Sequence, residues 1–342
     1  MRHRSRVVTH TLLIVLSLAP LYSSIVSADT LDQIRHRGTL RWGGDASGGG
    51  PYIYQGPDNR LTGFELELAE YLAAKLGVRS EFVAWEWEML PQILDRGTID
   101  VVLNGFEWSA EREQLWSSTI PYYIYQLELM TRKHDASIRS WDDLVAAPSE
   151  PRKSVGVLQG SAAERYVEER FGDAVVLKKY PELTSVMGLV ERGQLGALVQ
   201  DVPISIHYGP DFPDLHTVGE PQAPGYYVAY VRKSDERLRQ ALNAAIQAAI
   251  DDGTLERLYK KYGIWNDDQR RLAEVARDWP PTIAAADSRW ANLPHYTGML
   301  LKAAWTTVLL SFLSMPLAIL LGLIVAIGRL YGPWWIRLPF EG

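Results

Sequence analysis

Apolar positions along the chain recur with two different periods, and the two patterns alternate. Residues 63–77, GFELELAEYLAAKLG, place large apolar side chains on one helical face and end in glycine, which predicts an amphipathic helix. Residues 98–103, TIDVVL, are typical of a buried strand. Other strands are predicted at 38–44, 154–160, 174–180, 197–201 and 225–233, and other helices at 161–172, 184–193, 234–253 and 254–263. This alternation predicts parallel α/β layers.

Both halves of this region contain strand–helix–strand units, which predicts two α/β lobes in one domain at residues 29–265. We expect lobe 1 at about residues 29–130 and 225–265, because the last helices return to the first lobe. Lobe 2 is expected at about 131–224. The charged segment 266–298, which contains the sequence WPP, is predicted to be a linker.

The N-terminus has the pattern of an export signal. A basic start, MRHRSR, precedes an apolar stretch that ends in small residues at Val26, Ser27 and Ala28. This pattern predicts a signal peptide at 1–28, with an uncleaved anchor as the alternative. In both cases the domain that follows is expected outside the cytoplasm, in the periplasm or the extracellular space.

A second apolar stretch lies near the C-terminus. Residues 303–327 contain no charged side chain, and at about 1.5 Å per residue a helix of this length spans a bilayer. We therefore predict a transmembrane helix at 299–328 rather than a buried core helix. Arg329 and Arg337 follow the span, which favours a cytoplasmic tail at 329–342 and a location in the cell membrane.

Composition narrows the possible partners. The chain has 342 residues, a net charge of −6 and no cysteine, which excludes disulfides and thiolate metal sites and gives no reason to expect nucleic acid. Its seven histidines lack metal-ligand spacing, and phosphate-loop and serine-elbow motifs are absent from the sequence. We expect a binding protein rather than an enzyme, with no cofactor and no metal.

Chemically distinctive residues follow four of the predicted strands. They are Asp45, Arg112, Ser161 and Asp201. In open α/β sheets, ligands bind beyond the carboxyl ends of the strands, so these residues are expected to meet at one site. Such a set suits a zwitterion: Arg112 to hold a carboxylate, the amides after Gly160 to assist, and Asp201 to hold an ammonium group.

Each member of the set also has a purely structural interpretation. Ser161 and Asp201 fit helix N-caps, and Asp45 fits a turn in a glycine-rich loop. Arg112 fits an exposed helix residue, but it lies in the first turn after Ser109, where a cation opposes the helix dipole. The aromatic residues nearby are more often core than ligand-stacking residues; they are Tyr52, Trp85, Trp87 and Trp108.

The order of these pieces resembles extracellular solute-binding proteins of family 3, the polar amino-acid receptors of ABC importers. The resemblance covers roughly residues 31–265 and rests on GTLRWGG, LTGFELELAEYLAAKLG, LNGFEWSAERE, SVGVLQGS, LVQD and VRKSDERLRQALNAAIQAAIDDGTLERLYKKYG. It implies a type II periplasmic-binding-protein fold, with two lobes that close on the ligand about a hinge. The C-terminal span also resembles the first helix of the permease subunit of such importers, which implies a truncated permease domain or a fragment.

The resemblance implies roles for five residues. Arg112 matches the arginine that binds the ligand's α-carboxylate, and Asp201 matches the acidic residue that takes the α-ammonium group. Gly105 and Ser161 match positions that contact these same groups, and Asp45 matches a position that can meet a cationic ligand side chain.

Three departures from the family pattern concern the pocket for the ligand's side chain. Residues 48–50 are glycines where the family often has a stacking aromatic residue, for which Trp85 or Trp87 is a candidate substitute. Glu107 stands where the family usually has Ser or Thr, and Ala162 replaces a frequent Thr. The additional carboxylate at Glu107 favours cationic or amine-rich ligands.

The sequence thus predicts the receptor of an amino-acid ABC importer. It would capture a polar amino acid between its lobes and deliver it to a permease that a cytoplasmic ATPase drives. Two alternatives remain: a membrane-anchored amino-acid sensor, and a periplasmic dehydratase-like enzyme in which Glu107 is an acid or base.

Overall fold

The computed structural model describes residues 29–47, 49–147, 149–280 and 293–331. The chain divides into two compact units, 1–280 and 281–342, which we describe separately. The predicted signal peptide at 1–28 and most of the predicted tail lie outside the described residues.

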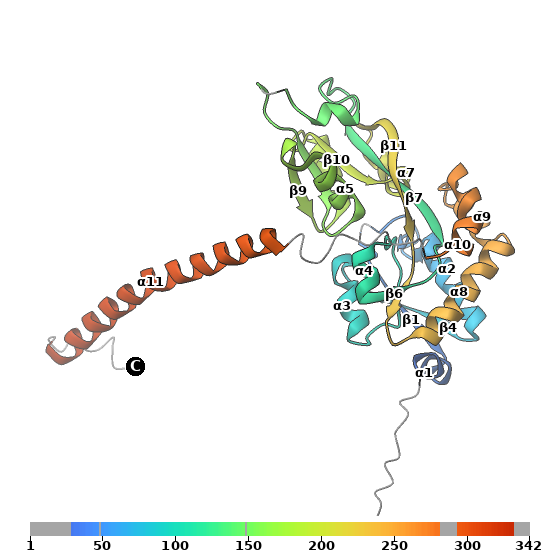
Figure 1. The fold of residues 1–342 in the computed structure, drawn as a ribbon, viewed down its shortest axis with the longest axis horizontal. Helices are drawn as coiled ribbons and strands as arrows, with labels where there is room; N and C mark the ends of the chain where they lie inside the picture. Colours follow the sequence, from blue (N-terminus) through green and yellow to red (C-terminus); the bar gives the residue numbers. More distant parts are fainter. Residues whose placement is uncertain (1–28, 48, 148, 281–292, 332–342) are drawn as a thin grey trace, which may run out of the picture. The chain divides into compact units, whose positions relative to one another are not determined.

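The first lobe is built on a five-stranded sheet with the order β4-β1-β5-β12-β6 (Figure 1). Its strands are β1 (Thr39–Gly44), β4 (Arg79–Ala84), β5 (Val101–Val102), β6 (Trp116–Ser118) and β12 (Tyr230–Arg232). β1 pairs with β4 and β5 in parallel, whereas β12 is antiparallel to β5 and β6. A two-stranded ribbon, β2 (Tyr54–Gln55) with β3 (Leu61–Thr62), accompanies this lobe.

The second lobe has a sheet of the order β11-β7-β10-β8-β9. Its strands are β7 (Tyr123–Arg132), β8 (Ser154–Leu158), β9 (Val176–Tyr180), β10 (Ala197–Asp201) and β11 (Leu215–Tyr227). β8 is parallel to β9 and β10, but β7 is antiparallel to β10 and β11. Both sheets are therefore mixed, and the prediction of parallel layers holds only for the strands that helices connect.

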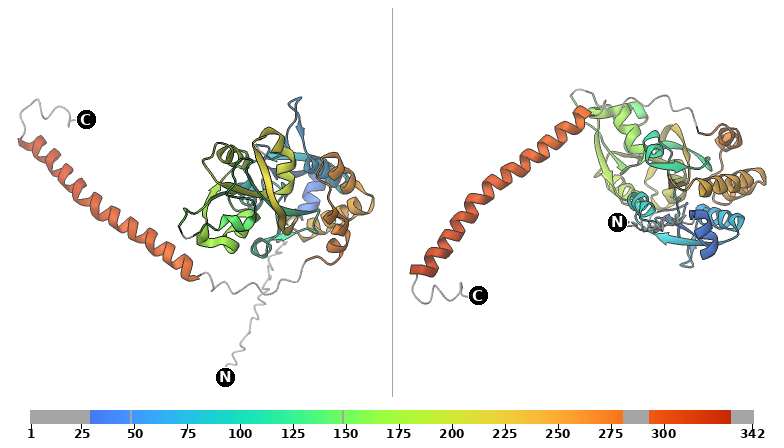
Figure 2. Two further views of the ribbon diagram at one scale, coloured as in Figure 1. Left: turned by 90° about the horizontal axis from the view of Figure 1, so that it is seen from above. Right: turned by 60° about the horizontal axis from the view of Figure 1, so that its bottom comes forward.

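Helices cover both sheets. Those of the first lobe are α1 (Thr30–Arg37), α2 (Phe64–Leu76), α3 (Leu90–Asp95), α4 (Ala110–Leu115), α8 (Glu236–Asp251), α9 (Thr254–Lys261) and α10 (Leu272–Arg277). Those of the second are α5 (Ala162–Phe171), α6 (Leu183–Glu191) and α7 (Val202–Tyr208). The views in Figure 2 show α8 to α10, in gold to brown, beside the blue N-terminal elements, with which α8 is in contact. The last helices of the domain thus pack against the N-terminal elements of the first lobe.

The chain crosses between the sheets twice, and the two crossings lie side by side. The Thr119 N–H donates to the Ala229 carbonyl at 2.9 Å, and the Tyr122 N–H donates to the Tyr227 carbonyl at 3.0 Å. The Ala229 N–H also donates to the Thr119 hydroxyl at 3.0 Å. Sheet pairing assigns all of β7 to the second sheet, so the first crossing precedes Tyr123 instead of falling near residue 131.

The second crossing divides a segment that we predicted as one strand. Within residues 225–233, β11 ends at Tyr227 and β12 begins at Tyr230 in the other sheet. Val228 and Ala229 connect the two strands. An apolar run shows that a segment is buried, but it does not show which sheet takes each part.

The predicted linker is too long at its N-terminal end. A short 3-10 helix (Asp267–Arg271) and α10 continue the folded unit, with Leu272 and Ala276 buried. The buried Gln269 side chain exchanges hydrogen bonds with both backbone groups of Ile124 in β7. Residues 266–280 are therefore part of the folded domain, and 281–292 lie outside the described residues.

The second unit contains one long helix, α11 (Leu293–Tyr331). Its segment Ala304–Ile327 is, by length and composition, able to cross a membrane, and side chains such as Phe312 and Met315 are exposed along it.

One buried carboxyl group in β7 makes the stability of the domain depend on pH. Glu128 is 8% exposed and lies opposite Gln200 of β10, and its Oε1 atom has no hydrogen-bond partner among the described residues. Burial raises the pKa of Glu128 to about 8. Because the folded pKa exceeds the unfolded one, the stability present when the group is protonated is lost as the pH rises from about 4.5 to about 8.

We expect Glu128→Gln to remove this loss. The difference in the free energy of unfolding, variant minus parent, should be larger at pH 9 than at pH 5 by roughly 2–5 kcal/mol. A shift of a few pKa units gives an effect of this size. Denaturant titrations followed by tryptophan fluorescence measure the difference. Glu70→Gln, the same change at an exposed position of α2, is the control, and an equal gain there would contradict the assignment to burial.

Candidate functional site

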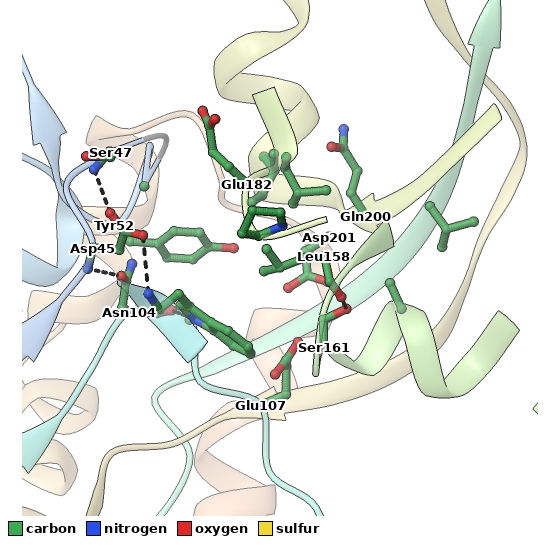
Figure 3. A pocket seen from close by; sticks show the side chains of 18 residues that line it. Asp45, Ser47, Tyr52, Asn104, Glu107, Leu158, Ser161, Glu182, Gln200 and Asp201 are labelled. Atoms are coloured by element: carbon green, nitrogen blue, oxygen red, sulfur yellow. Dashed lines mark hydrogen bonds between the residues drawn. The ribbon is translucent and has the colours of Figure 1, made fainter. Parts of the chain in front are cut away.

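A cavity lies where the ends of strands from both lobes meet (Figure 3). Its lining residues are Asp45, Ser47, Gly49, Tyr52, Trp87, Asn104, Gly105, Glu107, Leu158, Ser161, Ala163, Pro181, Glu182, Leu183, Val199, Gln200, Asp201 and Ile204. Four of them are carboxylates, and arginine, lysine and histidine are absent from the lining within the described part of the chain. The cavity is thus acidic, with apolar walls.

The loop after β5 brings the first lobe's contribution into place. Asn104 and Gly105 have positive φ angles of 103° and 62°, which turn the chain sharply after the strand. The buried Glu65 side chain accepts hydrogen bonds from the Gly105 N–H at 2.7 Å and the Tyr122 hydroxyl at 2.6 Å. Burial raises the pKa of Glu65 to about 7. Since the Gly105 N–H is already bonded, its carbonyl is the backbone group left for a ligand.

The next residues of this loop are held by the second crossing. The Val228 N–H donates to the Phe106 carbonyl at 3.0 Å, and the Trp108 N–H donates to the Tyr226 carbonyl at 2.8 Å. Glu107 lies between these two bonds, so the position of its backbone is fixed from both sides.

Glu107 and Arg112 form a buried ion pair at the edge of the cavity. The Nη1 atom of Arg112 donates to Oε2 of Glu107 at 2.7 Å and to its carbonyl at 2.7 Å. The Nη2 atom of Arg112 donates to the Gly160 carbonyl in the second lobe at 2.9 Å. The guanidinium lies 4.4 Å from the centre of the Phe106 ring. The side chain of Arg112 is 13% exposed and that of Glu107 is 3% exposed. The arginine in the first turn of α4 is therefore paired with a carboxylate, and this carboxylate belongs to the chain itself.

The N-terminus of α5 supplies the other donor to Glu107. The Ala162 N–H donates to Oε1 of Glu107 at 2.9 Å. Ser161 is the N-cap: its hydroxyl accepts from the Glu164 N–H at 3.2 Å and donates to the Leu158 carbonyl at 2.7 Å. The Glu164 carboxylate accepts a hydrogen bond from the Gly160 N–H, an arrangement close to a capping box. Ser161 lines the cavity, but its hydroxyl proton is already donated to the Leu158 carbonyl.

Asp201 lies at the end of β10, in a network of tyrosines. It accepts a hydrogen bond from the Tyr227 hydroxyl, which in turn contacts the Tyr52 hydroxyl at 2.7 Å. Burial, and after it the charge of Glu107, raise the pKa of Asp201 well above its ordinary range. Asp201 makes no side-chain cap to α7, so the predicted alternative of a simple helix cap does not apply.

Asp45 lies at the other side of the cavity, beyond the Tyr52 ring (Figure 3). Its two oxygens accept from the N–H groups of Ser47 at 2.8 Å and Trp87 at 3.2 Å. Partial burial raises the pKa of Asp45. The Trp87 ring stacks on Phe106 with 4.5 Å between the ring centres, and Trp87 also lines the cavity.

The structure brings together most of the residues that the sequence singled out. Those in the cavity lining are Asp45, Tyr52, Trp87, Gly105, Glu107, Ser161 and Asp201. Trp85 is 43% exposed and does not line the cavity, so of the two tryptophans only Trp87 is placed to replace the absent aromatic residue. Arg112 also lies outside the lining, because Glu107 stands in front of it.

Sequence reasoning missed several lining residues. Asn104 comes two residues after β5, and its side-chain oxygen accepts from the Asp45 N–H. Glu182 follows β9 and accepts from the Ser185 hydroxyl at 2.7 Å. Both stand beyond a strand's carboxyl end, so the rule that found Asp45 and Asp201 also selects them.

We expect a strong energetic coupling between Glu107 and Arg112, because removing either one leaves a buried charge without its partner. A double-mutant cycle of Glu107→Ala and Arg112→Ala, measured by denaturant unfolding, should give a coupling of about 2–4 kcal/mol. The exposed pair Glu256 and Lys260 on α9 is the control, with less than about 1 kcal/mol expected. Equal coupling in the two pairs would show that burial adds nothing.

Comparison with known proteins places the fold in context. Residues 40–264 match the family model described as bacterial extracellular solute-binding proteins, family 3. The L-cystine-binding protein TcyJ of Escherichia coli (strain K12) is 30% identical over 241 residues, which cover 70% of this chain and 88% of that protein. The histidine-binding periplasmic protein of the same strain is 26% identical over 226 residues, covering 62% of this chain and 83% of that protein.

Two solved structures show the same architecture. An ancestral arginine-binding protein bound to arginine has a TM-score of 0.61 and 30% identity, and the match covers 66% of this chain and 98% of that one. The ancestral amino acid-binding protein AncCDT-1, a precursor of cyclohexadienyl dehydratase, has a TM-score of 0.62 and 29% identity, covering 68% and 99%. The predicted two-lobed fold is confirmed, and the chain belongs to the bacterial extracellular solute-binding proteins of family 3.

Proposed function

We propose that this receptor captures a small cationic solute of the cationic amino-acid class and delivers it to an ABC permease that a cytoplasmic ATPase drives. The observation that carries the proposal is the acidic lining of the cavity by Asp45, Glu107, Glu182 and Asp201. The names of similar proteins, which bind arginine, histidine or cystine, support a nitrogen-rich solute of this size.

In the proposed orientation the ligand spans the cavity between its two acidic sides. Asp201 and the Gly105 carbonyl take one ammonium group, and Asp45 takes the second cationic group. Tyr52 lies between the two sides (Figure 3), and Trp87 also lines the cavity, so both are aromatic neighbours of a bound cation. Alkyl carbons of the ligand would lie against apolar wall residues such as Leu183 and Ile204.

Capture is a shift in the balance between open and closed forms. The lining comes from both lobes, so a ligand makes its full set of contacts only when the lobes are together. The paired crossings at Thr119 and Ala229 are where backbone rotation would separate them. A ligand that binds the closed form more tightly shifts the population toward it, without covalent chemistry.

Substitution of Asp201 or Asp45 by Asn should weaken binding of arginine and lysine by roughly 10–100-fold, because each removes a charged hydrogen-bond acceptor. Isothermal titration calorimetry of the full chain in detergent measures the change. Asp211→Asn, at an exposed position after α7, is the matched control and should leave affinity unchanged.

Two results would count against this function. One is binding of glutamate in preference to arginine, lysine and histidine. The other is consumption of the solute by purified protein, with loss of the turnover in Glu107→Gln, which would favour the dehydratase-like alternative.

We further propose that α11 anchors the receptor in the membrane, with the binding domain on the extracytoplasmic side. Its apolar segment Ala304–Ile327 is long enough to cross the hydrocarbon core. After expression in bacteria, the full chain should stay in the membrane fraction after alkaline washing, whereas a chain ending at residue 290 should appear in the soluble fraction. Release of the full chain by the wash would refute the anchor.

A further inference from the structure

The donors expected to receive a ligand's α-carboxylate are already occupied by Glu107. One oxygen of its carboxylate accepts from the Arg112 guanidinium at 2.7 Å, and the other accepts from the Ala162 N–H at 2.9 Å. The other terminal nitrogen of the Arg112 guanidinium, Nη2, donates to the Gly160 carbonyl. An arginine fork and the first free amide of a helix are a strong carboxylate site, and here the chain fills it with its own side chain.

Glu107 is also difficult to displace. Its side chain is 3% exposed, its carbonyl accepts a second bond from Arg112, and its backbone pairs with Tyr227. If the side chain turned away from Arg112 while the lobes stayed closed, a buried carboxylate would be left without its cation, which is strongly unfavourable. Its other polar neighbours include Asp201, whose pKa the charge of Glu107 already raises.

The rest of the cavity offers little to a second anion. Besides Glu107, its acidic lining residues are Asp45, Glu182 and Asp201, and the described lining contains no basic side chain. A carboxylate on the ligand would meet repulsion from these groups, whereas each ammonium group would be attracted. The charge balance of the site is therefore complete with a ligand that carries only positive charge.

We propose that Glu107 is a built-in substitute for the ligand's carboxylate, and that the preferred ligand is a small amine or diamine that has none. This inference rests on the proposed function, because it keeps Asp201 and Asp45 as the acceptors of the ligand's cationic ends. It changes the chemical class within that function, from cationic amino acids to the amines that lack their carboxylate, and it makes Glu107 the residue that determines specificity.

Matched pairs of ligands test the proposal directly. The pairs are arginine and agmatine, lysine and cadaverine, and ornithine and putrescine, which differ only by the α-carboxylate. Calorimetry of the full chain in detergent, at one pH and ionic strength, should give tighter binding of the amine in each pair by about tenfold or more. This comparison uses the parent chain, so it does not depend on the folding of a variant.

Glu107→Ser then frees Arg112 and the Ala162 N–H for a ligand carboxylate. We expect this variant to bind the amino acids more tightly than the parent does by about tenfold or more, and to reverse the preference within the pairs. The control is Glu111→Ser, at an exposed position of α4, the short helix that contains Arg112. This variant should keep the parent's preference.

The outcomes separate this inference from the function on which it rests. If the parent binds cationic ligands but prefers the amino acid of each pair, the proposed function stands and the role of Glu107 as a substitute is wrong. If Glu107→Ser folds and keeps the parent's preference, the same conclusion follows. If the parent binds a neutral amino acid such as cystine and none of the six cations, the proposed function fails, and the inference fails with it.

Discussion

The two adjacent crossings between the sheets are the constraint on which the rest of the structure depends. The segment that leads into β7 and the segment that leads out of β11 cross between the lobes side by side, hydrogen-bonded from residues 119 and 122 to residues 229 and 227. Contacts across the cavity, such as the bond from Arg112 to the Gly160 carbonyl, are made apart from these crossings. The cavity lies at this junction, so each lobe can carry half of a site on a rigid sheet. The same strand ends also fix the loop of Glu107, which couples the shape of the junction to the chemistry of the site.

Two effects limit the negative charge inside the cavity: burial raises the pKa of acidic groups, and one carboxylate forms an ion pair within the chain. Desolvation raises the pKa of Asp201, and it also raises that of Glu65, which accepts from the Gly105 N–H but is not among the lining residues. Glu107 is instead provided with a guanidinium and a helix amide. This difference matters for a cationic ligand. A carboxyl with a raised pKa, such as Asp201, becomes a strong acceptor when a cation binds next to it, whereas the Glu107 carboxylate already has a cationic partner in Arg112. The charge of Glu107 is thus balanced by Arg112, whereas the described lining contains no basic side chain to balance Asp201.

Much of this architecture could be predicted from the sequence, and the failures have physical causes. Helical and strand periods located the elements, and the rule of strand ends located Asp45 and Asp201. The split of residues 225–233 between sheets was not predictable, because both parts are equally apolar. Residues 266–280 look like a charged linker, yet Leu272 and Ala276, four positions apart, are the inward face of a short helix. Trp85 and Trp87 could not be distinguished, since regular alternation ends with β4 at Ala84.

The pairing of Glu107 with Arg112 follows from a turn that propensities do not describe, because it requires two consecutive positive φ angles. It has a consequence for competition. The two residues are five positions apart in the chain, so the Glu107 carboxylate faces Arg112 at an effective concentration of the order of millimolar or higher. A dissolved carboxylate at micromolar concentration is outnumbered at that spot by a factor of about a thousand or more. An intramolecular group can therefore exclude a whole class of abundant solutes without any steric barrier at the entrance.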